Sequence, residues 1–328
     1  MLQNIFCSPN VNPMKVNCPY CKNDSSKFLF RSYSFNHISF SFAQCRSCQC
    51  IHLQPIPGED VLEKAYSEQY YGEGESKFIK PVEKFIGYFL GQRARLVNSL
   101  LNGKGRVLDI GCGNGKFLKT LCSLGDYDVH GIERPGNSAE RAKKIKELNI
   151  HEGEIESIQL DQSFDAITMF HVFEHLTDPA AALDKIDILL KSGGTLVITV
   201  PNINGTQALL FKGYWFHLDI PRHIFFFSPK RFSELMLSRG YKLVSHDSFS
   251  LEHSIWGFYQ SLMNYLFADR DLFYEVLKGN RKLLKNKKFI FSLQVISLGI
   301  IIPFAFIEYL ISGIIGRGVQ KEYVFRKL

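Results

Sequence analysis

The segment Arg106–Leu118, RVLDIGCGNGKFL, constrains the fold more than any other part of the sequence. Its apolar run Val107–Ile110 is followed first by three alternate glycines, Gly111, Gly113 and Gly115, and then by apolar residues at helical spacing. This order predicts a strand, a tight turn and a helix whose N-terminus offers backbone N–H groups to a ligand. Glycine suits the turn because a Cβ would block the close approach of that ligand.

The spacing of the glycines and two nearby acids limit the choice of ligand. A dinucleotide site has its third glycine at the position that Lys116 occupies here. Asp109 would face the ligand, and a carboxylate there suits an ammonium better than a pyrophosphate. Glu133 ends the next apolar run, at the distance where an acid commonly takes ribose hydroxyls. An ammonium, a ribose and no phosphate together describe S-adenosylmethionine.

Strands and helices alternate in the middle of the chain. We predict a helix over 80–101, strands over 107–110, 129–133, 164–170 and 195–200, and helices over 116–124, 138–148 and 179–190 between them. Such alternation is typical of a parallel sheet with helices on both faces. Ligands of these sheets bind beyond the carboxyl ends of the strands, where the glycine turn also lies.

Four stretches in this order, VLDIGCGNGKFL, the strand end at Glu133, FDAITMFHVFEHLTDP and GGTLVITVPN, resemble the successive motifs of class I S-adenosylmethionine-dependent methyltransferases. A glycine turn alone would fit any Rossmann-like site, whereas four ordered motifs are specific. The resemblance implies a Rossmann-like α/β fold with a seven-stranded methyltransferase sheet. It also implies that the cofactor is bound by Asp109, Gly111, Gly113, Gly115 and Glu133, and by the backbone of Phe170 and His171.

Two C-x-x-C pairs near the N-terminus predict a zinc ribbon over residues 17–54, after a flexible arm over residues 1–16. Nothing in the sequence suggests secretion, so a metal is favoured over disulfides. Two such turns brought together by a hairpin supply four thiolates and leave no open position, so the zinc would be structural. The predicted ligands are Cys18, Cys21, Cys45 and Cys48, the alternatives being unligated thiols or a substitute ligand from Cys50 or His52.

Two loops at the carboxyl ends of the strands carry candidate catalytic residues. Methyl transfer to a hydroxyl requires a base, and histidine suits that role near neutral pH. We favour His223 as the base, with His175 and Glu174 as further candidates. The alternative is that Glu174 and His175 only order the loop beneath the cofactor. Arg222 would pair either with an acidic group on the acceptor or with a neighbouring surface acid.

The first of these loops also resembles the ubiquinone-pathway O-methyltransferases. In that family an acid followed by x-x-Glu-His holds a divalent cation. Glu174 and His175 match this pattern, but His171 stands where the acid is expected, which puts Mg²⁺ binding in doubt. Tyr66, Tyr70 and Tyr71 would form a lid over the cofactor or simply pack.

The C-terminal part predicts a large insertion between the last two strands of the sheet. With a core over 55–250 and a last strand over 321–328, residues 251–320 form an apolar helical insertion. Its stretch Phe289–Ile315 is long enough to span a bilayer and follows a basic segment. Both flanking strands join one sheet, so this stretch would dip into the membrane or lie along its surface through 278–315. The alternative is a helical subdomain that packs on protein.

These observations predict a cytoplasmic S-adenosylmethionine-dependent methyltransferase, peripheral on the inner face of the membrane. Its reaction would be O-methylation of a small-molecule or lipid-linked sugar acceptor, since similar organisation occurs in surface-polysaccharide and deoxysugar methyltransferases. The alternative is a non-catalytic protein that senses the cofactor or binds nucleic acid through the ribbon. The modest basic excess of the ribbon, four basic residues against Asp24 between Cys18 and Cys48, argues against nucleic acid.

Overall fold

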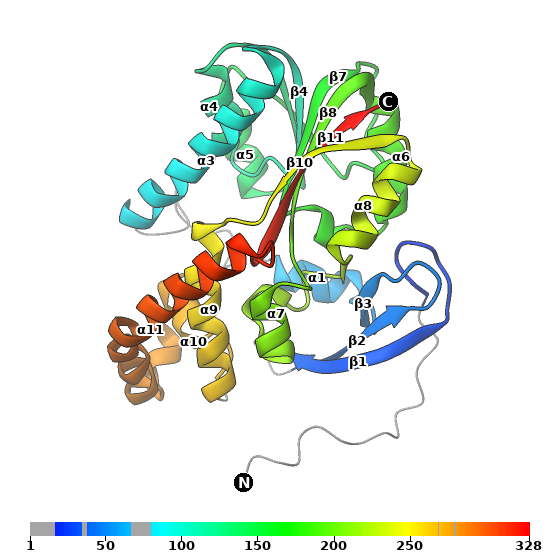
Figure 1. Cartoon of the computed structure of the whole chain (residues 1–328). Coiled ribbons are helices and arrows are strands. Elements are labelled where there is room, and N and C mark those ends of the chain that lie inside the picture. Colours follow the sequence, from blue (N-terminus) through cyan, green and yellow to red (C-terminus); the bar gives the residue numbers. More distant parts are fainter. Residues whose placement is uncertain (1–16, 35–37, 67–79, 268, 279) are drawn as a thin grey trace.

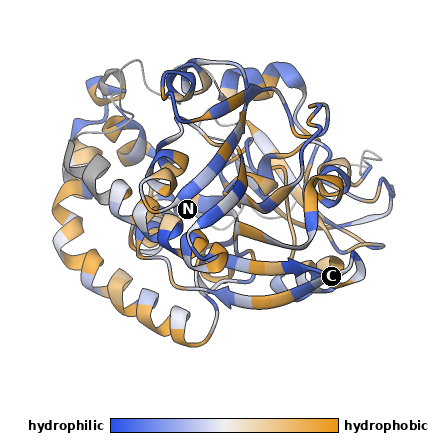
Figure 2. Ribbon diagram, turned by 90° about the horizontal axis from the view of Figure 1, so that it is seen from above, coloured by the Kyte–Doolittle hydropathy of each residue, from blue (hydrophilic) through white to orange (hydrophobic). Residues whose placement is uncertain are grey.

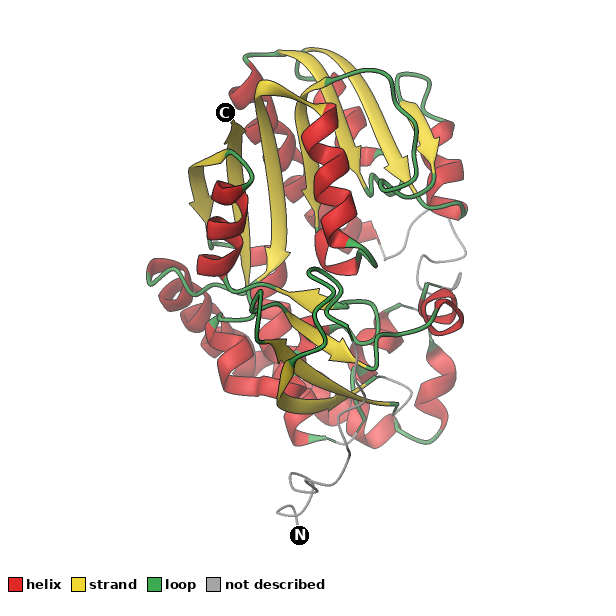
Figure 3. Cartoon of the chain, turned by 90° about the vertical axis from the view of Figure 1, so that its right-hand side faces the viewer, coloured by secondary structure: helices red, strands yellow, loops and turns green. Residues whose placement is uncertain are grey.

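The computed structural model describes residues 17–34, 38–66, 80–267, 269–278 and 280–328 (Figure 1). The predicted arm over residues 1–16, and with it Tyr70 and Tyr71 of the predicted lid, lies outside the described residues. Two sheets organise the chain, one of seven strands and one of four. Figure 3 shows the larger sheet above the smaller one.

The seven-stranded sheet has the order β10-β11-β8-β7-β4-β5-β6. Its strands are β4 (Lys104–Ile110), β5 (Asp126–Glu133), β6 (Asn149–Glu152), β7 (Phe164–Phe170), β8 (Leu190–Pro201), β10 (Tyr241–Asp247) and β11 (Gln320–Lys327). Strands β4 to β8 are parallel, while β11 runs antiparallel between β8 and β10. The predicted Rossmann-like, seven-stranded sheet is therefore confirmed, and its last two strands form an antiparallel pair.

Helices cover both faces of this sheet. They are α3 (Lys80–Leu101), α4 (Lys116–Cys122), α5 (Asn137–Lys143), α6 (Pro179–Leu189) and α8 (Pro229–Ser238). Figure 1 shows α3 and α4 on one face and α6 and α8 on the other. Leu118 and Leu121 of α4 are buried with Val107 of β4, whereas Ile186 and Phe232 are buried in the core on the opposite face. Apolar helix faces thus close the sheet on both sides.

The two largest differences from the sequence-based boundaries are in α5 and β8. Helix α5 ends at Lys143, five residues before the predicted end at 148. Strand β8 begins at Leu190, because Leu190 pairs with Phe164 before the register of the two strands shifts. The predicted loop after α6 is therefore part of a strand. Within this part, Gly193 adopts a positive φ of 74°.

The four-stranded sheet joins the N-terminal cysteine-rich segment to the core. It consists of β1 (Ser26–Tyr33), β2 (Ser39–Cys45), β3 (Ile51–Gln54) and β9 (Phe225–Phe226), in that order. Strand β9 belongs to the loop that follows β8, far along the chain. Because β9 pairs with β3, the ribbon is completed by a strand from the core. Helix α1 (Glu59–Ala65) follows the ribbon, and α7 (Thr206–Phe211) follows β8.

The insertion between β10 and β11 is helical, as predicted. It contains α9 (Leu251–Leu266), α10 (Leu272–Leu277), the short 3₁₀ turn η4 (Arg281–Lys285) and α11 (Lys288–Ile314). Helix α11 is continuous through Pro303, so it does not dip and return on itself. Among the described residues, it is the one helix that is long and apolar enough to cross a membrane.

Candidate active site

A cleft opens where the carboxyl ends of β4 and β5 meet the loop after β7. Its volume, including the space open to solvent, is about 810 Å³. It is lined by Tyr66, Ile110, Gly111, Gly113, Ile132, Glu133, Arg134, Gly153, Glu154, Ile155, His171, Val172, His175 and Leu176. The cleft therefore lies where ligands bind in open α/β sheets.

The three glycines of the turn have different structural roles. All have positive φ, between 58° and 74°, which side chains with a Cβ rarely adopt. A Cβ on Gly111 would lie 2.4 Å from Val172, and one on Gly115 would lie 2.6 Å from Leu148. A Cβ on Gly113 would meet nothing within 4 Å, so this glycine faces open space at the cleft.

The two acids predicted to hold the cofactor lie on neighbouring strands. The Glu133 Oε2 atom accepts a hydrogen bond from the Gly113 N–H at 2.7 Å, and burial raises the pKa of this carboxyl group. Asp109 accepts a hydrogen bond from the Thr168 hydroxyl at 2.6 Å, and burial raises its pKa to about 7. The charge of Glu133 adds to the shift of Asp109, so the two carboxyl groups lie close in space.

Not every residue of the predicted cofactor set lines the cleft. Gly111, Gly113, Glu133 and His171 do. Asp109 lies behind the cleft wall against Thr168, and Gly115 packs on the helical side of the turn. The Phe170 ring contacts the Phe117 ring, with 5.0 Å between centroids, and the Arg93 guanidinium lies 5.3 Å from its centre. These residues shape the cleft from behind.

Two residues on the rim of the cleft are Tyr66, which was predicted either to cover the cofactor or to pack, and Arg134, which was not assigned a role from the sequence. The guanidinium of Arg134 lies 5.0 Å from the centre of the Tyr66 ring. The Tyr66 hydroxyl lies 3.0 Å from the Nδ1 atom of His175. Tyr66 thus joins the cofactor cleft to the histidines behind it. The position of Arg134, directly after Glu133, is the signal that could have identified it.

A buried group of Glu174, His175 and His223 adjoins the cleft. Their ligand atoms lie within 4.8 Å of one another. Glu174 belongs to the 3₁₀ turn η1 (Phe173–His175) after β7, and neither of its carboxylate oxygens has a hydrogen-bond partner among the described residues. Burial raises the pKa of Glu174 to about 7. The predicted catalytic residues therefore come together in space.

The hydrogen bonds indicate the tautomers of the two histidines. Nδ1 of His175 lies 3.0 Å from the carbonyl oxygen of Arg222, and Nδ1 of His223 lies 2.8 Å from that of His217. A carbonyl oxygen only accepts, so each Nδ1 carries a proton and each Nε2 keeps its lone pair. Burial lowers the pKa of both imidazoles, which keeps them neutral. The Nε2 atom of His223 lies 3.8 Å from Glu174 Oε1.

Arg222 forms an ion pair inside the protein. Its Nε donates to Asp219 Oδ2 at 2.9 Å, and its Nη1 donates to the carbonyl oxygen of Ala65 at 3.3 Å. Burial works against ionisation of Asp219, yet the charge of Arg222 and its hydrogen bond to the carboxylate hold the pKa of Asp219 well below the usual value. This pairing agrees with the ion-pair alternative for Arg222 rather than with an acceptor contact.

The insertion contributes a histidine that sequence reasoning missed. His253 of α9 packs its ring against His171, with 4.5 Å between the centroids. Its carbonyl oxygen accepts a hydrogen bond from Nε2 of His217 at 3.1 Å. No local motif marks His253, because only the return of the insertion to the sheet brings it here. His253 therefore adjoins His171, which lines the cleft.

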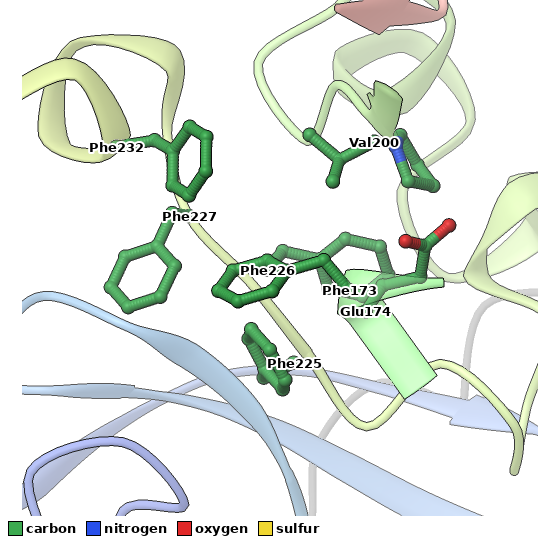
Figure 4. Close-up of a pocket in the computed structure, with 8 residues that line it drawn as sticks. Phe173, Glu174, Val200, Phe225, Phe226, Phe227 and Phe232 are labelled. Atoms are coloured by element: carbon green, nitrogen blue, oxygen red, sulfur yellow. The ribbon is translucent and has the colours of Figure 1, made fainter. Parts of the chain in front are cut away.

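An apolar crevice lies beside Glu174 (Figure 4). It is lined by Phe173, Glu174, Val200, Pro201, Phe225, Phe226, Phe227 and Phe232. Figure 4 shows the phenylalanine rings gathered on one side of the Glu174 side chain. These rings keep water from the carboxyl group, which accounts for its raised pKa.

The four predicted zinc ligands also converge. The sulfur atoms of Cys18 and Cys48 are 3.5 Å apart, as are those of Cys21 and Cys45, and all four lie within 4.8 Å of one another. With Zn–S bonds of about 2.3 Å, tetrahedral coordination requires sulfur atoms at about this separation. The donor set therefore fits zinc. Cys50 is also buried nearby, but it is not part of this group of four.

Backbone hydrogen bonds connect the ribbon to the histidine cluster. The N–H of Leu53 in β3 donates to the carbonyl oxygen of Ile224 at 2.9 Å. The N–H of Ile224 donates in turn to the carbonyl oxygen of Glu174 at 2.9 Å. Ile224 directly follows His223, so the ribbon, the proposed base and Glu174 share one hydrogen-bonded segment.

The buried histidines should make stability depend on pH. Burial lowers the pKa of His253 well below its usual value, so between that value and about 6.5 the unfolded chain binds a proton that the folded chain does not. Its stabilising contribution is present above about pH 6.5 and is lost as the pH falls. Between about pH 7.5 and about pH 5.0, the melting temperatures of the wild type and of His253→Phe should both fall. We expect the drop for His253→Phe to be a few degrees smaller than the drop for the wild type.

Thermal melting followed by circular dichroism would measure this difference. His246→Gln, at an exposed position on β10, is the control and should follow the wild type at both pH values. Parallel melting curves of His253→Phe and wild type at both pH values would contradict the prediction.

Comparison with known proteins supports the interpretation of the core. Residues 85–246 match a family described as a methyltransferase domain. The chain is 26% identical over 186 residues to the mitochondrial ubiquinone biosynthesis O-methyltransferase of Dictyostelium discoideum, covering 48% of this chain and 58% of that one. It is 34% identical over 112 residues to the ubiquinone biosynthesis O-methyltransferase of Neisseria meningitidis serogroup C, covering 32% and 47%. The chain thus spans about half the length of the curated relatives it matches.

A solved structure with a similar arrangement is coclaurine N-methyltransferase bound to N-methylheliamine and S-adenosylhomocysteine. The TM-score is 0.44 at 16% identity, over 78% of this chain and 76% of the other. The sheet, the glycine turn and the acid at the end of β5 define an α/β protein with a cleft at the carboxyl ends of its parallel strands. Together with the family match, they indicate a methyltransferase domain over residues 85–246 that is similar to the class I S-adenosylmethionine-dependent methyltransferases.

Proposed function

We propose that this protein transfers the methyl group of S-adenosylmethionine to a hydroxyl oxygen of a small-molecule or lipid-linked sugar acceptor. One observation carries the proposal. His175 lines the cofactor cleft and also belongs to the buried group that contains Glu174 and His223. A methyl donor in the cleft and a base would therefore be neighbours, as O-methylation requires. The relatives named as O-methyltransferases support transfer to oxygen.

The cleft fits the proposed cofactor. Glu133 is positioned to accept hydrogen bonds from ribose hydroxyls, and Gly113 leaves room for the backbone to approach the ligand. We propose that Asp109 supplies negative charge near the ammonium group, from its place behind the turn. When bound, S-adenosylmethionine supplies an electrophilic methyl group on a sulfonium.

His223 would act as the base. Its neutral Nε2 would take the proton from the acceptor hydroxyl as the oxygen–carbon bond forms, and it would later release that proton to solvent. Glu174 would stabilise the resulting imidazolium, since its carboxyl group lies 3.8 Å from the same nitrogen. Glu174 is then a positioning residue for His223. His175 would fix the position of Tyr66, since the Tyr66 hydroxyl lies 3.0 Å from Nδ1 of His175.

We further propose that the four clustered cysteines hold one structural zinc ion. Four thiolates leave no coordination position for a substrate, so the metal would support folding rather than chemistry. We also propose that the enzyme works in the cytoplasm, at the inner surface of the membrane, where a lipid-linked sugar would be found. The basic and apolar insertion supports this location.

Cofactor binding provides the direct test. Glu133→Gln should weaken S-adenosylmethionine binding about ten- to a hundredfold in titration calorimetry, because charged hydrogen bonds to the ribose are lost. Glu140→Gln, at an exposed position on α5, is the matched control and should bind like the wild type. A folded wild-type protein with no affinity for S-adenosylmethionine or S-adenosylhomocysteine would overturn the proposal. Incubation with labelled cofactor and extracted glycolipids, followed by mass spectrometry, would identify the acceptor.

A further inference from the structure

Helix α11 is apolar on nearly all sides, so large apolar side chains are exposed wherever it does not pack on the protein. Eight large apolar residues, each between 40% and 76% exposed, follow one another at steps of three or four residues along its outer face. We call this set the outer stripe: Phe289, Leu293, Ile296, Ile300, Phe304, Ile307, Ile311 and Ile314. A soluble helix would turn such a stripe inward. Figure 2 shows the helix as a long hydrophobic rim of the molecule.

Three polar residues of α11, Gln294, Glu308 and Ser312, face the protein. Glu308 accepts hydrogen bonds from Gln207 of α7 at 2.7 Å and from Ser312 at 2.6 Å. The backbone oxygen of Gln294 accepts a hydrogen bond from the Tyr259 hydroxyl of α9 at 2.5 Å. These contacts fix the rotation of the helix about its axis, so the exposure of the outer stripe is part of the fold.

We infer that the outer stripe lies in the interface of an anionic lipid bilayer, with α11 parallel to the membrane plane. The charges around the stripe support a lipid occupant. Lys285 and Lys288 are exposed at its N-terminal end and Arg317 is exposed beyond its C-terminal end. The one acid of α11, Glu308, is turned inward. Cations at both ends of an apolar face complement anionic headgroups above hydrocarbon.

The surrounding contacts argue against a membrane-spanning orientation. Helix α9 packs along α11, and Lys287 at the start of α11 binds Asp269 at 2.5 Å. The other end of α11 leads directly into β11, which pairs with β8 in the core. A span would carry one of these attached parts through the bilayer. A helix of 27 residues, about 40 Å long, can instead lie flat and bury one face.

The membrane orientation of α11 also suggests how a lipid-linked acceptor would reach the site. This link between the membrane and the acceptor rests on the proposed function. Helix α9 packs on the inner side of α11 and carries His253 against His171. The membrane face and the acceptor side of the site therefore share one supporting helix. A lipid-linked sugar could reach His223 while its lipid tail stays in the bilayer. Docking itself can be measured without any acceptor or cofactor.

Vesicle flotation of the full chain tests the inference. With phosphatidylcholine–phosphatidylglycerol vesicles, Ile296→Asp and Ile300→Asp should each lower the partition coefficient about tenfold or more, because each removes an inserted side chain. Ile188→Asp on α6 and Leu237→Asp on α8 are matched controls, since these residues are 74% and 66% exposed far from α11. Vesicles of phosphatidylcholine alone, or high salt, should weaken wild-type binding.

Two outcomes would overturn the inference. One is equal binding of the stripe variants, the control variants and the wild type. The other is a wild type that ignores vesicles but sediments as a dimer, which Ile300→Asp converts to a monomer; the stripe would then bind a second copy of the chain. Neither result bears on cofactor binding, so failure here is distinct from failure of the proposed methyl transfer.

Discussion

Replacing His223 with asparagine should slow methyl transfer about 10²- to 10⁴-fold, because the change removes the nitrogen that we propose as the base. Asparagine suits the test since its amide N–H can still donate to the carbonyl oxygen of His217, as Nδ1 of His223 does at 2.8 Å. The loop should therefore keep its conformation. The affinity for S-adenosylhomocysteine should stay within about threefold of the wild type, because His223 does not line the cofactor cleft.

The pH dependence gives a second readout of the same site. Burial raises the pKa of Glu174 to about 7, so its charge develops as the pH rises through neutrality. A negative carboxylate next to His223 favours the imidazolium that forms during proton transfer. The rate of methyl transfer by the wild type should therefore rise as the pH increases through about 7. This rise should disappear in Glu174→Gln. His246→Gln is the control, and an unchanged rate in His223→Asn would rule out the proposed base.

The parallel core was predictable because its signals are local. Val107–Ile110 ends at glycines that the turn requires, and Asp178 and Pro179 mark the start of α6, where the Asp178 carboxylate accepts from the Ala181 N–H. Each strand carries its own apolar run and its own stop signal. The sheet order then follows from the parallel alternation. The position of Glu174 and His175 near the cleft was predictable for the same reason, since both follow the end of β7, whereas His223 comes long after the end of β8 and reaches them through the path of its loop.

The remaining features depend on contacts between distant segments. Strand β9 has two residues, too few for a strand pattern, and it exists because Phe225 and Phe226 pair with β3. His253 reaches the site only through the path of the insertion. The sequence of α11 shows that it is apolar, but it does not show which face is exposed. The partners of Glu308 and Gln294 decide that.

Loss of the proposed zinc ion of the ribbon should abolish methyl transfer almost completely while sparing the cleft between β4, β5 and the loop after β7. Cys45→Ser removes one of the four convergent thiolates, and a sheet this small depends on its metal for folding. Without an ordered β3, Ile224 loses its bond to the Leu53 N–H and no longer holds Glu174 and His223 in register. The rate should fall about 10²- to 10⁴-fold, as for direct loss of the base.

Several measurements distinguish local displacement of His223, caused by loss of zinc, from general unfolding of the protein. Elemental analysis should find one zinc ion per wild-type chain, and less in Cys45→Ser, if four thiolates bind one metal. S-adenosylhomocysteine should still bind to Cys45→Ser within about tenfold of the wild type, because β4 and β5 supply most of the cleft. Cys122→Ser on α4 removes a half-buried thiol outside the ribbon and should change neither zinc content nor rate. Full activity in zinc-free protein would show that the ribbon does not position His223.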